Sequence, residues 1–209
     1  MKFFAGCLAA LLLTLSFAPL SVAHFKLLEP ASWLVENNLG DPQKAAPCGG
    51  TSQNPGMPSN VIGKIKGGTK LHLKMQETVF HPGHYRVALA VNSRAELPKD
   101  PEVTTRMQAN RQGLQAPWSV SAVIMNPVKP PVLADGLFPH TDRAAMPMFW
   151  ETDIDIPNIT CTKCTLQIIQ FMAEHGLNAD GDYSYHHCAD LQITADPAKP
   201  LATGWPAGK

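Results

Sequence analysis

The sequence predicts an all-β fold, an antiparallel β-sandwich with long loops. Three observations predict it: short segments in which apolar and polar residues alternate, Gly and Pro residues that bound these segments, and no long apolar stripe at helical spacing. Within the 209-residue chain, residues 24–196 are long enough to form one domain with a sizeable core.

The first 23 residues have the pattern of a secretory signal peptide. Lys2 precedes an apolar run, and the small residues Ser21 and Ala23 stand at the positions that signal cleavage requires. A membrane anchor is the alternative, but the run is short and no second span of about 20 apolar residues follows. We therefore expect residues 1–23 to be removed, which leaves a secreted or periplasmic protein without a membrane anchor that begins at His24.

Five segments carry the strand pattern. In residues 69–77, the clearest of them, Leu71, Leu73 and Met75 fall on one face and charged or polar residues fall on the other. The remaining predicted strands are 85–91, 150–156, 165–171 and 189–194. Short strands of this kind are typical of a sandwich, and we predict one of the immunoglobulin or fibronectin-like type.

Two long stretches do not show this pattern. Residues 24–66 are rich in Pro, Gly and Asn and predict an extended entry strand followed by a long loop, and residues 92–147 predict a second long loop with a short helix around 103–112. Long loops on a rigid sandwich commonly build binding surfaces. We expect the tail, residues 197–209, to be loose, and Asn158 matches a glycosylation acceptor.

The charge balance argues against a highly charged partner. The chain has 17 Lys and Arg residues and 17 Asp and Glu residues, without a block of like charge. This balance disfavours nucleic acid and an anionic membrane surface as partners. We expect a neutral partner and a monomeric protein.

Four cysteines remain after removal of the signal: Cys48, Cys161, Cys164 and Cys188. An even number in an exported protein indicates disulfides, and four cysteines allow three pairings. The Cys161-x-x-Cys164 spacing is also found in redox motifs and in half of a zinc site, but a second motif of this kind is missing from the sequence.

The histidines carry the predicted chemistry. After cleavage, His24 would have an α-amino nitrogen and an imidazole that can bind one metal ion together. His81 and His84 flank a Pro-Gly turn between two predicted strands, and because residues three apart in a strand face opposite sides, only one of them would join His24. Three nitrogen donors in an open arrangement favour copper; the simpler interpretation is that His81 and His84 are ordinary turn and core histidines.

At these residues the chain resembles the lytic polysaccharide monooxygenases, a family of histidine-brace copper proteins. The resemblance rests on His24 directly after the signal, on the turn that begins at His81, and on Tyr185-x-x-Cys188 near the C-terminus. It implies one copper ion held by His24, through its amine and side chain, and by His81, with Tyr185 in the axial place. His81 is preferred over His84 because it occupies the first position of the turn.

The resemblance extends to neighbouring residues. It implies that Gln170 lies near the copper and steers oxygen species, and that Cys48 pairs with Cys188, which leaves Cys161 for Cys164. The chain departs from the family pattern at His186 and His187, where small or polar residues are usual. These two histidines and His84 would then either tune the copper site or bind a second ion.

The activity implied by the resemblance is oxidative cleavage of glycosidic bonds in a polysaccharide. An external electron donor reduces Cu(II) to Cu(I), and oxygen or hydrogen peroxide then serves to hydroxylate a glycosidic carbon. Two alternatives stay open: an exported copper-binding or trafficking protein with the same brace, and a carbohydrate-binding or adhesion module without metal. Trp33, Trp118, Phe138 and Trp150 are candidates either for an aromatic substrate surface or for the core.

Overall fold

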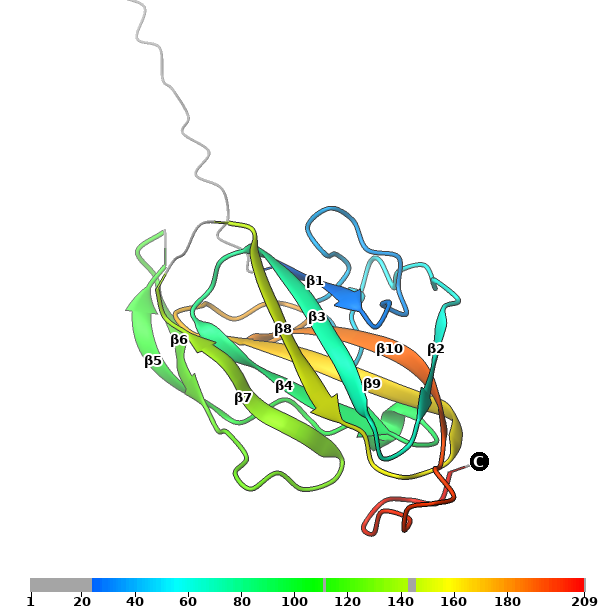
Figure 1. The fold of residues 1–209 in the computed structure, drawn as a ribbon. Helices are drawn as coiled ribbons and strands as arrows, with labels where there is room; N and C mark the ends of the chain where they lie inside the picture. Colours follow the sequence, from blue (N-terminus) through cyan, green and yellow to red (C-terminus); the bar gives the residue numbers. More distant parts are fainter. Residues whose placement is uncertain (1–23, 111, 143–145, 209) are drawn as a thin grey trace, which may run out of the picture.

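The computed structural model describes residues 24–110, 112–142 and 146–208, and this part of the chain forms an all-β sandwich (Figure 1). The predicted fold class is confirmed, while its immunoglobulin or fibronectin-like type stays a prediction. The predicted signal peptide lies outside the described residues. Within them, no helix is long and apolar enough to cross a membrane. The strands are β1 (His24–Glu29), β2 (Ile62–Lys66), β3 (Lys70–Val79), β4 (Gly83–Ala90), β5 (Val103–Ala109), β6 (Gln115–Ala122), β7 (Val132–His140), β8 (Met148–Asp155), β9 (Cys161–Met172) and β10 (Ser184–Thr194), with one 3-10 helix, η1 (Arg94–Glu96).

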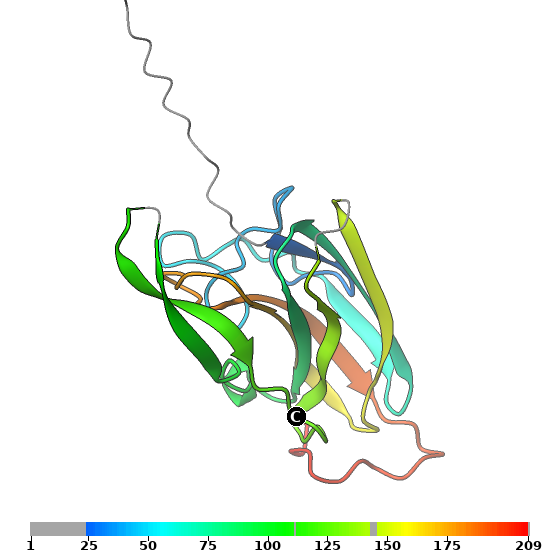
Figure 2. The ribbon, with the colours of Figure 1, turned by 90° about the vertical axis from the view of Figure 1, so that its left-hand side faces the viewer.

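The described strands form three sheets. A small sheet with the order β1-β3-β8 packs on a large sheet with the order β2-β10-β9-β4-β7, as Figure 1 shows, and β5 and β6 form a separate hairpin. All neighbouring strands are antiparallel except β2, which runs parallel to β10. In Figure 2 the hairpin (green) stands at the side of the sandwich.

The apolar residues that alternate along β3 face the core, as the sequence predicts. Leu73 and Met75 are fully buried between the sheets, whereas Lys70 and His72 face solvent and pair with Asp155 and Asp153 of β8. Strands β4 and β9 are buried along most of their length because the small sheet covers one face and loops and the hairpin cover the other. The fully buried core is therefore built mainly on these two central strands and their neighbours.

The predicted helix around residues 103–112 is wrong, because this segment forms β5 and pairs with β6. The hairpin turn is organised by Asn110, whose side chain accepts hydrogen bonds from the backbone N–H groups of Gln112 and Leu114. Gly113 follows with a φ of +76°, a conformation that glycine adopts without strain. The β-branched residues of β5 then extend along β6, where Thr104 bonds Ser121 (2.7 Å).

Two further strands lie in segments that the sequence predicted as loops. β2 pairs with β10 at the end of the first long segment. β7 pairs with β4 through several register shifts and contains Gly136 and Phe138 with φ values of +68° and +50°. This irregular backbone breaks the two-residue period, so the sequence pattern of β7 is hidden.

The C-terminal segment makes contacts that a loose tail would lack. The Asn158 amide nitrogen donates to the carbonyl oxygens of Asp196, Lys199 and Pro200, and its oxygen accepts from the Asp196 N–H. Trp205 packs against the core. The segment expected to be loose therefore contacts the domain at Lys199, Pro200 and Trp205. The Asn158 side chain is buried in these contacts rather than exposed as a glycosylation acceptor.

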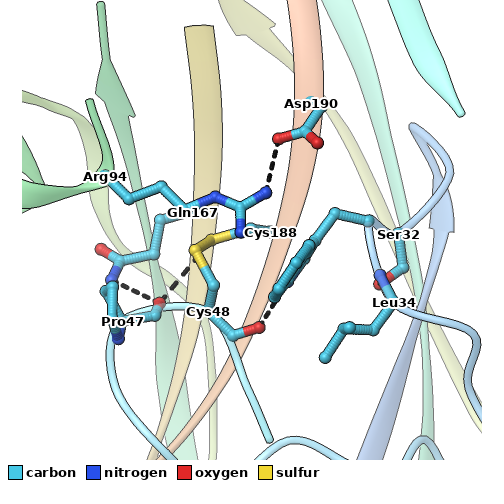
Figure 3. Close-up of a disulfide and its surroundings, with 9 residues drawn as sticks. Ser32, Leu34, Pro47, Cys48, Arg94, Gln167, Cys188 and Asp190 are labelled. Carbon is cyan, nitrogen blue, oxygen red and sulfur yellow. Dashed lines mark hydrogen bonds and ion pairs between the residues drawn. A yellow bond between two sulfur atoms is a disulfide. The ribbon is translucent and has the colours of Figure 1, made fainter. Parts of the chain in front are cut away.

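Two disulfides connect the cysteines, Cys48 with Cys188 and Cys161 with Cys164, which is the pairing that the resemblance implied. Figure 3 shows the first of them, which ties the loop after β1 to β10. Trp33 strengthens this connection, because its backbone N–H donates to the Cys188 carbonyl (2.8 Å) and its ring N–H donates to the Cys48 carbonyl (2.6 Å). The Arg94 guanidinium lies 3.6 Å from the centre of the Trp33 ring.

The two disulfides should differ in their effect on stability. Cys48 and Cys188 are 140 residues apart, so replacing both by Ser should lower the free energy of unfolding by about 2–5 kcal/mol. The Cys161→Ser/Cys164→Ser protein is the matched control. Its free energy of unfolding should fall by less, because only 3 positions separate the two cysteines. Urea denaturation of both variants measures the difference, and equal losses would contradict the prediction.

Candidate metal centre

His24 begins β1 and is held at both its backbone and its side chain. Its carbonyl accepts a hydrogen bond from the Thr78 hydroxyl of β3 (3.1 Å), and its Nε2 lies 3.1 Å from an Asp41 carboxylate oxygen. The hydrogen bond from His24 lowers the pKa of Asp41, so the carboxylate is ionised and accepts a hydrogen bond from the Nε2–H group. Metal-binding histidines commonly donate one ring N–H to a carboxylate in this way, and coordination by His24 would then use Nδ1.

The Tyr185 side chain meets His24 from the large sheet. Its ring contacts the His24 ring edge to face, with 5.5 Å between the centroids. Tyr185 is fully buried, and its hydroxyl has no hydrogen-bond partner among the described residues. Burial raises the pKa of this phenol, so it is neutral at physiological pH. Since an unpaired buried hydroxyl is costly, a ligand beside His24 would give its oxygen a partner.

Gln170 lies in β9 between two tyrosines. It is opposite Tyr185 of β10 on one side and opposite Tyr85 of β4 on the other, so the three side chains share the face that points toward the small sheet. The amide nitrogen donates to Glu77 of β3 across the sandwich (3.2 Å). The amide oxygen is buried and lacks a hydrogen-bond partner within the described part of the chain. The predicted site residues Gln170 and Tyr185 are therefore neighbours.

His81 lies in the turn between β3 and β4, after the last residue of β3. Its backbone N–H donates to Glu77 Oε1 (2.9 Å), and its carbonyl accepts from His140 Nε2 (2.7 Å). The His81 ring lies 4.7 Å from the His175 ring, measured between centroids. His81 and both of its neighbouring imidazoles are largely buried.

These contacts connect all the predicted ligands in one cluster. His24 joins it through the ring of Tyr185, and His81 joins it through Glu77, which also binds Gln170. We call these five residues the brace cluster. The His24 imidazole, the Tyr185 phenol and the Gln170 amide are thus linked to the backbone of His81. His24 begins β1, at the end of the sandwich opposite the C-terminal segment (Figures 1 and 2).

Three residues of this region were missed by the sequence reasoning, Glu77, His140 and His175, and Trp150 was expected only as a surface or core aromatic. A signal for Glu77 was present, because it continues the apolar face of Leu71, Leu73 and Met75, where a carboxylate is unexpected. The two histidines come from distant segments. No local pattern marks them, and only the fold brings them to the turn at His81.

Two other histidines that the sequence placed near the ligands point elsewhere. The His84 ring packs on Phe171 at 5.2 Å, and His186 bonds the Lys44 carbonyl and the Asp100 carboxylate at 2.9 Å each. Because side chains alternate along a strand, both lie on the face of the large sheet that points away from the brace cluster.

His187 points into the sandwich and forms a buried pair with Glu36. Its Nε2 donates to the Phe25 carbonyl (2.9 Å), and its Nδ1 lies 3.0 Å from a Glu36 oxygen. Burial lowers the pKa of His187 to about 4 and raises the pKa of Glu36 to about 7. The pair therefore carries little charge in mildly acidic solution, and it supports the backbone next to His24.

Among the described residues, no group of three or more His, Cys, Asp or Glu side chains is arranged to hold a metal ion. A histidine brace does not need three such side chains, because it uses two imidazoles and completes the donor set with the N-terminal amine of the chain. In the comparisons with known proteins, no family model matches the chain and no curated protein matches it significantly.

Glu36 should give the protein a defined pH dependence. Its folded pKa of about 7 lies above the ordinary value of 4.5, so its contribution to stability is complete below pH 4.5 and is lost as the pH rises through 7. Glu36→Gln should remove this loss, with an upper limit of about 3 kcal/mol. In thermal unfolding, the Tm of the variant relative to that of wild type should be higher at pH 8 than at pH 5.

Glu102→Gln is the matched control for this prediction, since Glu102 is an exposed residue directly before β5. The difference in unfolding temperature between this variant and wild type should change little between pH 5 and pH 8. A Glu36→Gln protein that keeps the wild-type pH slope would show that the Glu36 carboxyl is ionised throughout this range.

Proposed function

We propose that the protein, cut after Ala23, is an exported copper protein that cleaves glycosidic bonds of a polysaccharide oxidatively. The observation that carries this proposal is the contact of His24 with the buried Tyr185 ring, whose hydroxyl lacks a hydrogen-bond partner among the described residues. The resemblance of His24, His81 and Tyr185 to the histidine-brace pattern supports it. The disulfides support the exported location.

The donor set suits a copper ion. The His24 imidazole, the His81 imidazole and the amine that cleavage would create are all nitrogen donors. Among the common divalent metals, copper binds such donors most tightly. Asp41 holds Nε2 of His24 and so orients the ring for binding through Nδ1. Bound copper would supply the one-electron chemistry with oxygen or peroxide, and an external electron donor is a required partner.

The remaining residues of the cluster would shape the site. The Tyr185 hydroxyl is neutral and lies beside His24, so it could supply a weak oxygen donor to a bound copper ion. The Gln170 amide oxygen is a buried acceptor without a partner among the described residues, so it can accept a hydrogen bond from water or from another donor that enters the site. These two residues would direct the reaction without exchanging a proton with the substrate.

The four candidate surface aromatics favour a second function. Trp33 hydrogen-bonds the Cys48 carbonyl through its ring, and Phe138 stacks on Trp150 at 5.3 Å. Three of the four side chains are thus used in packing, while Trp118 pairs with Gly176 through its backbone. A copper-binding or trafficking protein with the same brace needs no aromatic substrate surface, and this observation favours that alternative.

Copper binding should depend on the new N-terminus. Protein that begins at His24 should bind one Cu(II) per chain in isothermal titration calorimetry. His24→Ala and His81→Ala should each weaken copper binding at least about 100-fold. Loss of a residue that only hydrogen-bonds a metal ligand already lowers metal affinity about 10–100-fold. A protein with one extra residue before His24 should show the same loss, because its His24 nitrogen is an amide.

His72→Ala is the control, because His72 is exposed on the outer face of β3 and pairs with Asp153. It should bind copper as wild type does. Wild-type affinity in the His24→Ala protein, or secretion of a chain that begins elsewhere, would rule out the brace.

Polysaccharide cleavage separates the two copper functions. Copper-loaded protein should release oxidised oligosaccharides from at least one of chitin, cellulose, xylan and pectin when a reductant and hydrogen peroxide are present. The His81→Ala protein should release none, and mass spectrometry identifies the products. No release from any substrate, together with efficient transfer of copper to an acceptor, would support trafficking instead.

A further inference from the structure

The Glu77 carboxylate is fully buried between the two sheets. Its Oε1 accepts from the His81 backbone N–H (2.9 Å) and from Gln170 Nε2 (3.2 Å). Its Oε2 accepts from Trp150 Nε1 (3.1 Å) and lies 3.3 Å from His140 Nε2. Three hydrogen-bond donors and the His140 imidazole, from four separate segments, therefore surround one carboxylate.

His140 completes this arrangement at the end of β7. Its Nδ1 lies 2.7 Å from the Phe138 carbonyl, and its Nε2 lies 2.7 Å from the His81 carbonyl. A carbonyl only accepts, so both ring nitrogens carry a proton and the ring is an imidazolium. Its positive charge offsets the negative charge of Glu77, which makes burial of both groups tolerable.

The backbone of His81 depends on these two side chains. β3 ends at Val79 and the pairing of β4 with β9 begins at Gly83, so His81 lies outside the strand ladders. A buried backbone N–H and carbonyl need hydrogen-bond partners. In the structure Glu77 binds the N–H and His140 binds the carbonyl.

We propose that Glu77 and His140 form a backbone clamp that positions His81 and thereby sets where its imidazole meets the metal ion. This inference rests on the proposed function, in which His81 is a copper ligand. Neither clamp residue binds the metal. The clamp acts through the main chain, whereas outer partners of a metal-bound histidine usually act through the second ring nitrogen. It also couples the position of the ligand to the register of β3, β7 and β9.

The test compares two aromatic replacements in the same contact group. His140→Phe keeps a ring between Phe80 and Trp150 but removes the hydrogen bond to the His81 carbonyl. Trp150→Phe removes one donor to Glu77 and leaves both backbone bonds of His81 in place. Both variants should unfold at lower temperature than wild type, so a lower Tm alone does not identify the clamp.

Copper binding and the Cu(II) electron paramagnetic resonance spectrum distinguish the two roles. His140→Phe should weaken copper binding about 10–100-fold and should give an altered or heterogeneous spectrum, while Trp150→Phe should stay within about threefold of wild type and keep its spectrum. Wild-type affinity and spectrum in the His140→Phe protein would overturn the clamp and leave His140 with a packing role alone.

A measurement on metal-free protein keeps the clamp separate from the proposed function. The amide proton of His81 should exchange with solvent at least about tenfold faster in His140→Phe than in Trp150→Phe, because the turn opens locally when its carbonyl is released. If wild type bound no copper but this difference appeared, the proposed function would fail and the backbone clamp would stand. Equal exchange rates in both variants would overturn the clamp.

Discussion

The rest of the structure depends on the contacts that the buried carboxylate of Glu77 makes. A charge in the interior of a sandwich requires several donors at once, and Glu77 receives them from β8, from β9, from the end of β7 and from the turn at His81. These segments belong to both sheets. The relative placement of the sheets and the position of the predicted metal ligand are therefore set by the same group.

The second constraint is the attachment of the loop after β1. The Cys48–Cys188 disulfide and the two hydrogen bonds of Trp33 tie this loop to β10. The same loop supplies Asp41 to the His24 ring, and β10 supplies Tyr185 three residues before Cys188. One anchoring point thus organises His24, its partner Asp41 and Tyr185, which explains how an irregular segment can hold the residues of the proposed site in place.

Regular alternation made the core strands predictable, and irregular backbone hid the others. Leu71, Leu73 and Met75 predicted the inner face of β3 because every second side chain of a strand meets the core. β7 escaped prediction because its register shifts and the positive φ of Phe138 interrupt this period. The helix predicted from residue 103 was wrong because the turn at Asn110 lets a segment with weak periodicity pair with β6.

The sequence by itself determined the all-β class and the candidate ligands, since these follow from local period and from residue chemistry. Only the tertiary structure decided which groups support the ligands. Glu77 and His140 are 63 positions apart along the chain, yet they bind the same residue, His81. Contacts of this kind depend on how two sheets pack and how their strands are ordered, and no local pattern in the chain encodes them.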